Sequence, residues 1–234
     1  MLSGYSFRPR AWPLAAAAAA CAAGIALGNW QSGRAAEKRA LGAELRRSLE
    51  APPIELGSVQ GRASELVRKR VAVRGRLVDA HTIYLDNKLR RGRPGYEVVT
   101  PLRLDGAHVL VNRGWVPAAA TRDVLPAIST PPGEVRIEGL VLARVPKALE
   151  IGPRASGKVR QNLDVDAFAT QTGLRLLPIV IEQHSSLPDG LLREWPRPDA
   201  GVEKHQSYAM QWYSLAALAV VLFVVLSFRR VGAP

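Results

Sequence analysis

YAMQWYSLAALAVVLFVVLSF, residues 208–228, is the stretch that decides how this chain is organised, because it is long, apolar and uncharged. As a helix rising about 1.5 Å per residue, it is about 31 Å long and matches the hydrocarbon core of a bilayer. Two arginines follow it directly. The pattern predicts a transmembrane helix over 208–228, followed by a short tail at 229–234.

A second uncharged stretch, WPLAAAAAACAAGIALGNW, occupies residues 12–30. It is about 28 Å long as a helix and has tryptophan at both ends, where interfacial aromatic residues are common. We expect a first transmembrane helix over 12–30, preceded by a tail at 1–11. The alternatives are a cleaved signal peptide and a lipoprotein acylated at Cys21. We favour the uncleaved anchor, because the apolar run is longer than a usual signal core and continues into a helical pattern.

Positive charges indicate how the two spans are oriented. The arginines outside the spans are Arg8, Arg10, Arg229 and Arg230. Positively charged flanks favour the cytoplasmic side, so both termini are expected in the cytoplasm; in a bacterium, the two helices would then cross the inner membrane. The segment between the spans, residues 31–207, is then the extracytoplasmic domain, which in a bacterium is periplasmic.

That segment is rich in β-strand patterns. RVAVRGRLV (70–78) alternates apolar and polar residues, which predicts a strand with one buried face. Further strand patterns lie at 82–86, 96–104, 107–116, 133–142 and 177–183, a turn-rich stretch at 87–95, and helical patterns at 35–50, 58–69 and 163–173. The dipeptide Asp105-Gly106 is typical of a two-residue hairpin. The expected fold is a membrane α-helical hairpin flanking an α+β, mainly antiparallel, β-barrel-like extracytoplasmic domain.

The composition excludes several classes of function. The chain has 32 Lys+Arg against 20 Asp+Glu, giving a net charge of +12, but the cations are dispersed and predict a solvated surface rather than a nucleic-acid interface. One cysteine, Cys21, excludes a disulfide framework and cysteine-based zinc sites. No nucleophile elbow, zinc-protease, phosphate-loop or dinucleotide motif is present, so we expect no enzyme.

The most informative polar cluster, KHQSYAMQW (204–212), lies at the start of the second span. If the helix begins before the apolar run, one face of it carries His205, Tyr208, Ala209 and Trp212. A histidine at the outer membrane boundary can ligate haem iron while the apolar helix faces the macrocycle. The alternative is that His205 is an interfacial residue and Trp212 packs on the first helix. The spacing alone favours that alternative.

Three separated motifs resemble those of the surfeit locus protein 1 family, membrane-anchored assembly factors of cytochrome c oxidase. LGNWQSGR (27–34) resembles the family's Gly-x-Trp-Gln-x-x-Arg signature. VLVNRGWVP (109–117), with GRPGYEVVTPL (92–102) before it, resembles its internal motif. HQSYAMQW (205–212) resembles its His-x-x-Tyr-Ala-x-x-Trp motif. Motif order, spacing and the two-helix topology agree over nearly the whole chain.

The resemblance implies a chaperone of respiratory-chain biogenesis that binds haem a transiently and assists its insertion into, or retention in, oxidase subunit I. For bacterial members it implies that His205 is the axial ligand of the haem iron, the one metal expected here. Tyr208, Trp212 and Trp30 would pack around that ligand. Arg34 and Arg113 are weaker candidates for contacts with haem propionates or a partner. The structural alternative for Arg113 is a carboxylate partner inside the domain.

The partners implied are cytochrome c oxidase subunit I, the lipid bilayer and, as a further candidate, haem a synthase. No nucleic acid is expected. Two alternative functions are also compatible with the sequence. One is a protein-binding scaffold that stabilises an oxidase assembly intermediate without binding haem, and the other is an envelope protein unrelated to respiration.

Overall fold

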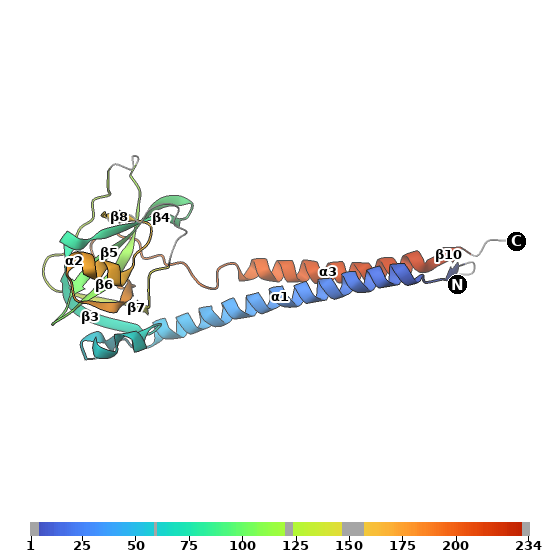
Figure 1. The fold of residues 1–234 in the computed structure, drawn as a ribbon, viewed down its shortest axis with the longest axis horizontal. Coiled ribbons are helices and arrows are strands. Elements are labelled where there is room, and N and C mark those ends of the chain that lie inside the picture. The colour runs from blue at the N-terminus through green and yellow to red at the C-terminus, as the bar shows by residue number, and fades with distance from the viewer. Residues whose placement is uncertain (1–4, 59, 120–123, 147–156, 231–234) are drawn as a thin grey trace. The chain divides into compact units, whose positions relative to one another are not determined.

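The structure is a computed structural model that describes residues 5–58, 60–119, 124–146 and 157–230 of the chain. The chain divides into two compact units. The first combines Met1–Glu44 with Pro196–Pro234, and the second is Leu45–Trp195. The first is a helical hairpin and the second a β domain, as Figure 1 shows.

The hairpin consists of α1 (Ala11–Glu50) and α3 (Val202–Ser227), which lie side by side (Figure 1). Small residues of α1 face α3, among them Gly24 and Gly28. A Cβ atom on Gly24 would lie 2.9 Å from the Cβ of Ala216, so a larger side chain there would push the helices apart. Close approach through small residues is the usual way in which helices pack within a bilayer.

Both helices are long and apolar enough to cross a membrane. The most apolar stretch of each helix is only 11% buried within the molecule, so the protein itself does not cover these apolar side chains. A large uncovered apolar surface is typical of a membrane contact. The predicted helical continuation over 35–50 is confirmed, since α1 runs to Glu50. It ends there because a residue that precedes a proline, here Ala51, is disfavoured from the helical conformation.

The chain ends, predicted as plain tails, contain a two-stranded pair within the described residues. β1 (Tyr5–Phe7) pairs antiparallel with β10 (Phe228–Arg230). The rings of Phe7 and Phe228 have their centroids 5.3 Å apart, and the Arg230 guanidinium lies 6.0 Å from the Tyr5 ring centroid. This pair ties the start of α1 to the end of α3.

The β domain is built on a closed, five-stranded barrel. Its strands are β3 (Arg70–Leu77), β5 (Arg93–Arg103), β6 (His108–Pro117), β7 (Val135–Leu142) and β9 (Leu176–Gln183). The order around the barrel is β3-β7-β9-β6-β5, and β5 closes it by pairing with β3. Every neighbouring pair is antiparallel except β6–β9, so the predicted mainly antiparallel barrel is confirmed. The order β7-β3-β5-β6 is a Greek key.

Shorter elements extend and cover the barrel. They are β2 (Ile54–Glu55), β4 (Ile83–Arg90), β8 (Val159–Arg160) and the helix α2 (Val165–Thr172). Asp164 caps α2 by accepting the backbone N–H groups of Asp166 and Ala167, and Gly173 ends it at φ 70°, as the pattern over 163–173 predicted.

Hydrophobic residues are buried on both faces of β5 and β6. Val109 and Val111 belong to one core cluster with residues of β3 and β7. Their neighbour Leu110 belongs to a second cluster, together with Val99 and with Phe168 of α2. Since successive side chains of a strand point to opposite faces, β6 separates the two cores.

The structure refines two predictions of local structure and confirms a third. The turn-rich stretch 87–95 is a tight hairpin, because β4 and β5 pair up to the Arg90–Arg93 register. Arg91 and Gly92 both have positive φ, as a type I′ turn requires. The stretch 58–69, predicted as a short helix, overlaps short 3₁₀ helices at Leu56–Ser58 and Gln60–Leu66. The hairpin predicted at Asp105-Gly106 is confirmed, with Gly106 at φ 76°.

Candidate functional site

His205 lies in the first turns of α3, which begins at Val202, ahead of the apolar run. This confirms the condition on which the predicted helical face depended. The side chain of His205 is half-buried, and its Nδ1 lies 2.7 Å from Oε1 of Gln31 on α1. Both residues belong to the hairpin unit, so the contact is internal to it.

The Gln31 contact determines which nitrogen of His205 can bind a ligand. An amide oxygen only accepts hydrogen bonds, so the Nδ1 of His205 must be the donor. In a neutral imidazole the other nitrogen, Nε2, then carries the lone pair. Within the described part of the chain, Nε2 has no hydrogen-bond partner. Metal-ligating histidines typically hold their second ring nitrogen in this way, so the residues present fit a haem iron ligand.

The residues predicted to lie around His205 differ in how far they are exposed. On α3, Ala209 is buried, Trp212 is half-buried and Tyr208 is 51% exposed. Trp30 of α1 is 59% exposed. The helix face predicted from spacing is therefore split: Ala209 turns towards the other helix, while Tyr208 leaves half of its surface uncovered.

Arg34 lies one turn after Gln31 on α1. Its Nη1 donates to Glu37 Oε2 at 2.7 Å, and both side chains are exposed. An exposed i, i+3 pair of this kind contributes little to stability. Arg34 therefore keeps exposed guanidinium surface on the same stretch of the hairpin as Gln31.

Sequence reasoning missed three polar residues at the contact between the helices, namely Gln31, Tyr213 and its partner Asn29. Gln31 is the first of them. Tyr213 is the second, since its hydroxyl donates to Asn29 Oδ1 at 2.8 Å, and its ring occupies the space that a side chain at Gly28 would need. Their signal in the sequence is weak, because a polar residue at the end of an apolar run is ordinary in any membrane helix.

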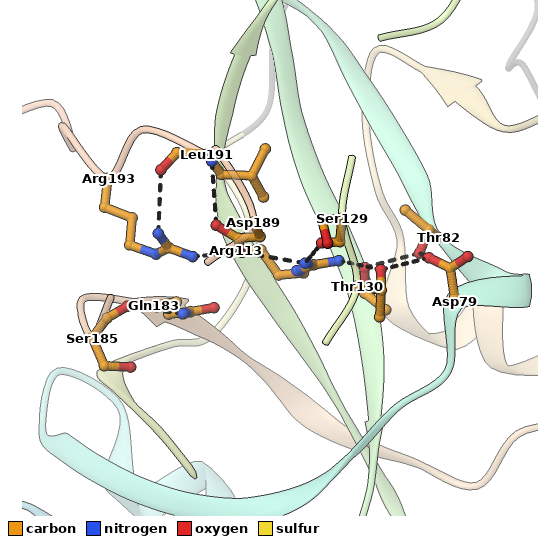
Figure 2. Close-up of polar contacts among 11 residues, drawn as sticks. Asp79, Thr82, Arg113, Ser129, Thr130, Gln183, Ser185, Asp189, Leu191 and Arg193 are labelled. Carbon is orange, nitrogen blue, oxygen red and sulfur yellow. Dashed lines mark hydrogen bonds and ion pairs between the residues drawn. The ribbon is translucent and has the colours of Figure 1, made fainter. Parts of the chain in front are cut away.

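Arg113 lies in the β domain, on β6, and its side chain is 0% exposed. Figure 2 shows its guanidinium between Asp189 on one side and Ser129 and Thr130 on the other. Its Nη2 donates to Asp189 Oδ2 at 3.2 Å and to the Ser129 carbonyl at 2.7 Å, and its Nη1 donates to Thr130 Oγ1 at 3.0 Å. Burial lowers the pKa of Arg113, and the neighbouring Asp189 carboxylate opposes that shift.

These contacts correspond to the structural alternative for Arg113. The guanidinium fastens two segments, around 129–130 and around 189, onto β6. In this structure the guanidinium of Arg113 is fully buried and offers no surface to a haem propionate.

Its neighbours in the motif have internal partners as well. Trp115 is buried in the domain, and its Nε1 donates to the Lys88 carbonyl at 2.8 Å. Asn112 Nδ2 donates to Glu97 Oε2 at 3.0 Å, and Arg90 Nη2 donates to the other oxygen of that carboxylate at 2.6 Å. The motif over 109–117 therefore joins β6 to the β4–β5 hairpin.

The fold and the site define a class of protein: a helical hairpin whose two helices are separated in the sequence by a small Greek-key barrel. Comparison with known proteins identifies the class more closely. Residues 18–217 match the model of the SURF1 family, and the chain belongs to that family.

Curated relatives are similar along most of their length. The SURF1-like protein of Monosiga brevicollis is 29% identical over 220 residues, covering 88% of this chain and 83% of the relative. The SURF1-like protein of the bacterium Rickettsia felis is 27% identical over 238 residues, covering 88% of this chain and 92% of the relative. Surfeit locus protein 1 of Mus musculus is 28% identical over 228 residues, covering 89% and 74%.

Proposed function

We propose that this protein is a cytochrome c oxidase biogenesis factor that binds haem a transiently and assists its insertion into, or retention in, subunit I. Membership of the SURF1 family supports the role in oxidase assembly, which the resemblance of the three motifs implied. The protein acts as a chaperone and leaves the haem chemically unchanged. Haem a is its cargo.

The observation that carries the haem proposal is the state of His205. One of its ring nitrogens is held by Gln31 at 2.7 Å, and the other is free to bind iron. A single imidazole ligand at a helix end suits a group that must later be released. Tyr208 and the half-buried Trp212 follow on the same helix and offer aromatic surface to a macrocycle, and Trp30 offers more from α1. Arg34 is the candidate partner for a propionate, since a guanidinium can pair with a carboxylate through two hydrogen bonds.

We place α1 and α3 across the bacterial inner membrane, with both termini in the cytoplasm and the β domain in the periplasm. The exposed apolar surface of the two helices and the arginines at the chain ends support this orientation. His205 then lies at the periplasmic boundary of the bilayer. Subunit I receives the haem there, and haem a synthase is a candidate donor.

The test is an optical spectrum of the full chain, purified in detergent from cells that make haem a. The wild type is compared with His205→Ala and with the control Lys204→Ala, which changes an exposed neighbour on the same helix turn. We expect a haem a spectrum in the wild type and the control, and its loss or shift in His205→Ala. A colourless wild type would refute haem binding, and equal haem in all three proteins would refute His205 as the ligand.

A second candidate function is a scaffold that stabilises an oxidase assembly intermediate without touching haem. It is favoured by the motif over 109–117, whose polar side chains make contacts inside the β domain rather than at an open site. On this alternative, His205→Ala leaves oxidase assembly in cells intact, whereas unfolding of the β domain abolishes it. Oxidase content in a deletion strain complemented by each variant separates the two candidates.

A further inference from the structure

We propose that Gln31 is the positioning residue for His205: its side-chain oxygen holds the Nδ1–H tautomer and thereby presents Nε2 to the haem iron. The part about iron rests on the proposed function above. The part about the tautomer does not, because it concerns the protein without haem. Two separate measurements can therefore test it.

The atoms that meet define the role. Gln31 contributes an amide oxygen, which has lone pairs and no hydrogen, so the proton of the 2.7 Å contact must belong to Nδ1 of His205. The hydrogen bond also fixes the rotation of the imidazole ring about its side chain. A ligand nitrogen with a defined lone pair and a defined direction binds a metal more tightly than one that must be ordered upon binding, and the donor hydrogen bond raises its basicity.

The packing of the helices keeps Gln31 in place. It is half-buried and 174 residues away from His205 in the chain, so the contact exists only while α1 and α3 are packed together. Gly28, one turn before Gln31, lets the ring of Tyr213 approach. The Tyr213 hydroxyl donates to Asn29 at 2.8 Å, a second polar contact that fixes how the helices are aligned. The acceptor for Nδ1 is thus a half-buried side chain whose position depends on the packing of the two helices.

The tautomer of His205 can be measured directly in the haem-free protein. ¹⁵N-histidine NMR of the full chain in detergent, at about pH 8 where an ordinary histidine is neutral, distinguishes Nδ1–H from Nε2–H rings. His184 is an internal reference of the opposite kind, because its Nε2 lies 3.1 Å from a Glu182 carboxylate oxygen, which accepts from Nε2–H. The signal of His205 is identified by its absence in His205→Ala. We expect the Nδ1–H form in the wild type and its loss in Gln31→Leu.

The second measurement is haem a affinity, titrated into the same proteins. Loss of the partner of a metal-bound histidine typically weakens metal binding about 10- to 100-fold, and we expect that loss for Gln31→Leu. Gln31→Glu keeps an acceptor for Nδ1, so it should retain the Nδ1–H tautomer and bind haem, with a lower iron reduction potential because the imidazole is more electron-rich. The matched control is Gln206→Leu, the same change at an exposed glutamine beside His205, which should leave affinity unchanged.

An Nε2–H ring at His205 in the wild type would overturn the inference, whatever the haem result. A Gln31→Leu variant with wild-type haem affinity would also overturn it. If Gln31→Leu and Gln31→Glu both lost haem to the same extent as each other, the oxygen acceptor would not be the reason, and the inference would fail. If the Nδ1–H tautomer is present in the wild type and lost in Gln31→Leu but the wild type binds no haem, the proposed function alone is refuted and Gln31 still orients His205.

Discussion

Replacing Asp189 by asparagine should destabilise the β domain more than replacing Arg113 by methionine, although the two side chains form one buried ion pair. The reason is that the pair is asymmetric. Asp189 Oδ2 accepts from Arg113 at 3.2 Å and from Arg193 at 2.6 Å, so this carboxylate has two cationic partners. Asp189 is the one acidic residue in an ion pair with Arg113 among the described residues.

The expected magnitudes follow from what each change leaves behind. Asp189→Asn leaves the fully buried Arg113 without a counter-charge, which costs about 3–5 kcal/mol of unfolding free energy. Arg113→Met leaves Asp189 paired with Arg193. The other acceptors of the Arg113 guanidinium, on Ser129 and Thr130, belong to a segment that water can reach. We therefore expect a loss of about 1.5–3 kcal/mol, the value of a hydrogen bond to a charged group. The double variant should cost less than the sum, because it removes the uncompensated charge.

The assay is equilibrium unfolding of the full chain in detergent by urea, followed by circular dichroism of the β-sheet. Arg91→Met is the control, because Arg91 pairs with Glu194 at the surface, where an ion pair contributes about 0–1 kcal/mol. The reasoning is refuted if Arg113→Met proves at least as destabilising as Asp189→Asn, or if the two costs simply add.

Three further predictions concern other parts of the molecule. Gly24→Leu should separate the two helices of the hairpin, because even a Cβ atom there would lie 2.9 Å from Ala216 Cβ and from a backbone oxygen of α3. In mixed SDS micelles the equilibrium between packed and separated helices should shift towards the separated form, and an unchanged equilibrium would contradict the packing. Burial, together with nearby cations, lowers the pKa of His108, so the folded state resists protonation and the β domain should lose stability as the pH falls below about 6.5. The melting temperature measured against pH should fall in this range in the wild type and fall less steeply in His108→Gln. Asp164→Ala removes the cap of α2 and should cost about 1 kcal/mol in the urea assay, while a neutral result would mean that Phe168 alone holds this helix.

Local pattern sufficed for the elements whose environment is simple. A bilayer requires about 20 consecutive apolar residues, so the two long helices could be read from composition alone. β3 could be read because its solvent-facing arginines alternate with buried residues. The alternation is lost in β5 and β6, since both of their faces are buried. Their boundaries therefore depended on the turn at Asp105-Gly106, and the hairpin at Arg91-Gly92 was missed because arginine is unusual at positive φ.

The sequence by itself determined the two apolar helices, the β-rich segment between them and the position of His205 at the start of the second helix. Only the tertiary structure decided that β5 closes the barrel onto β3, that Arg113 is enclosed beside Asp189, and that Gln31 meets His205. The physical reason is the sequence separation of the residues that interact. Helix and strand periodicity depends on neighbours a few residues apart, whereas the Gln31–His205 contact joins residues 174 positions apart and depends on how two helices pack through their glycines.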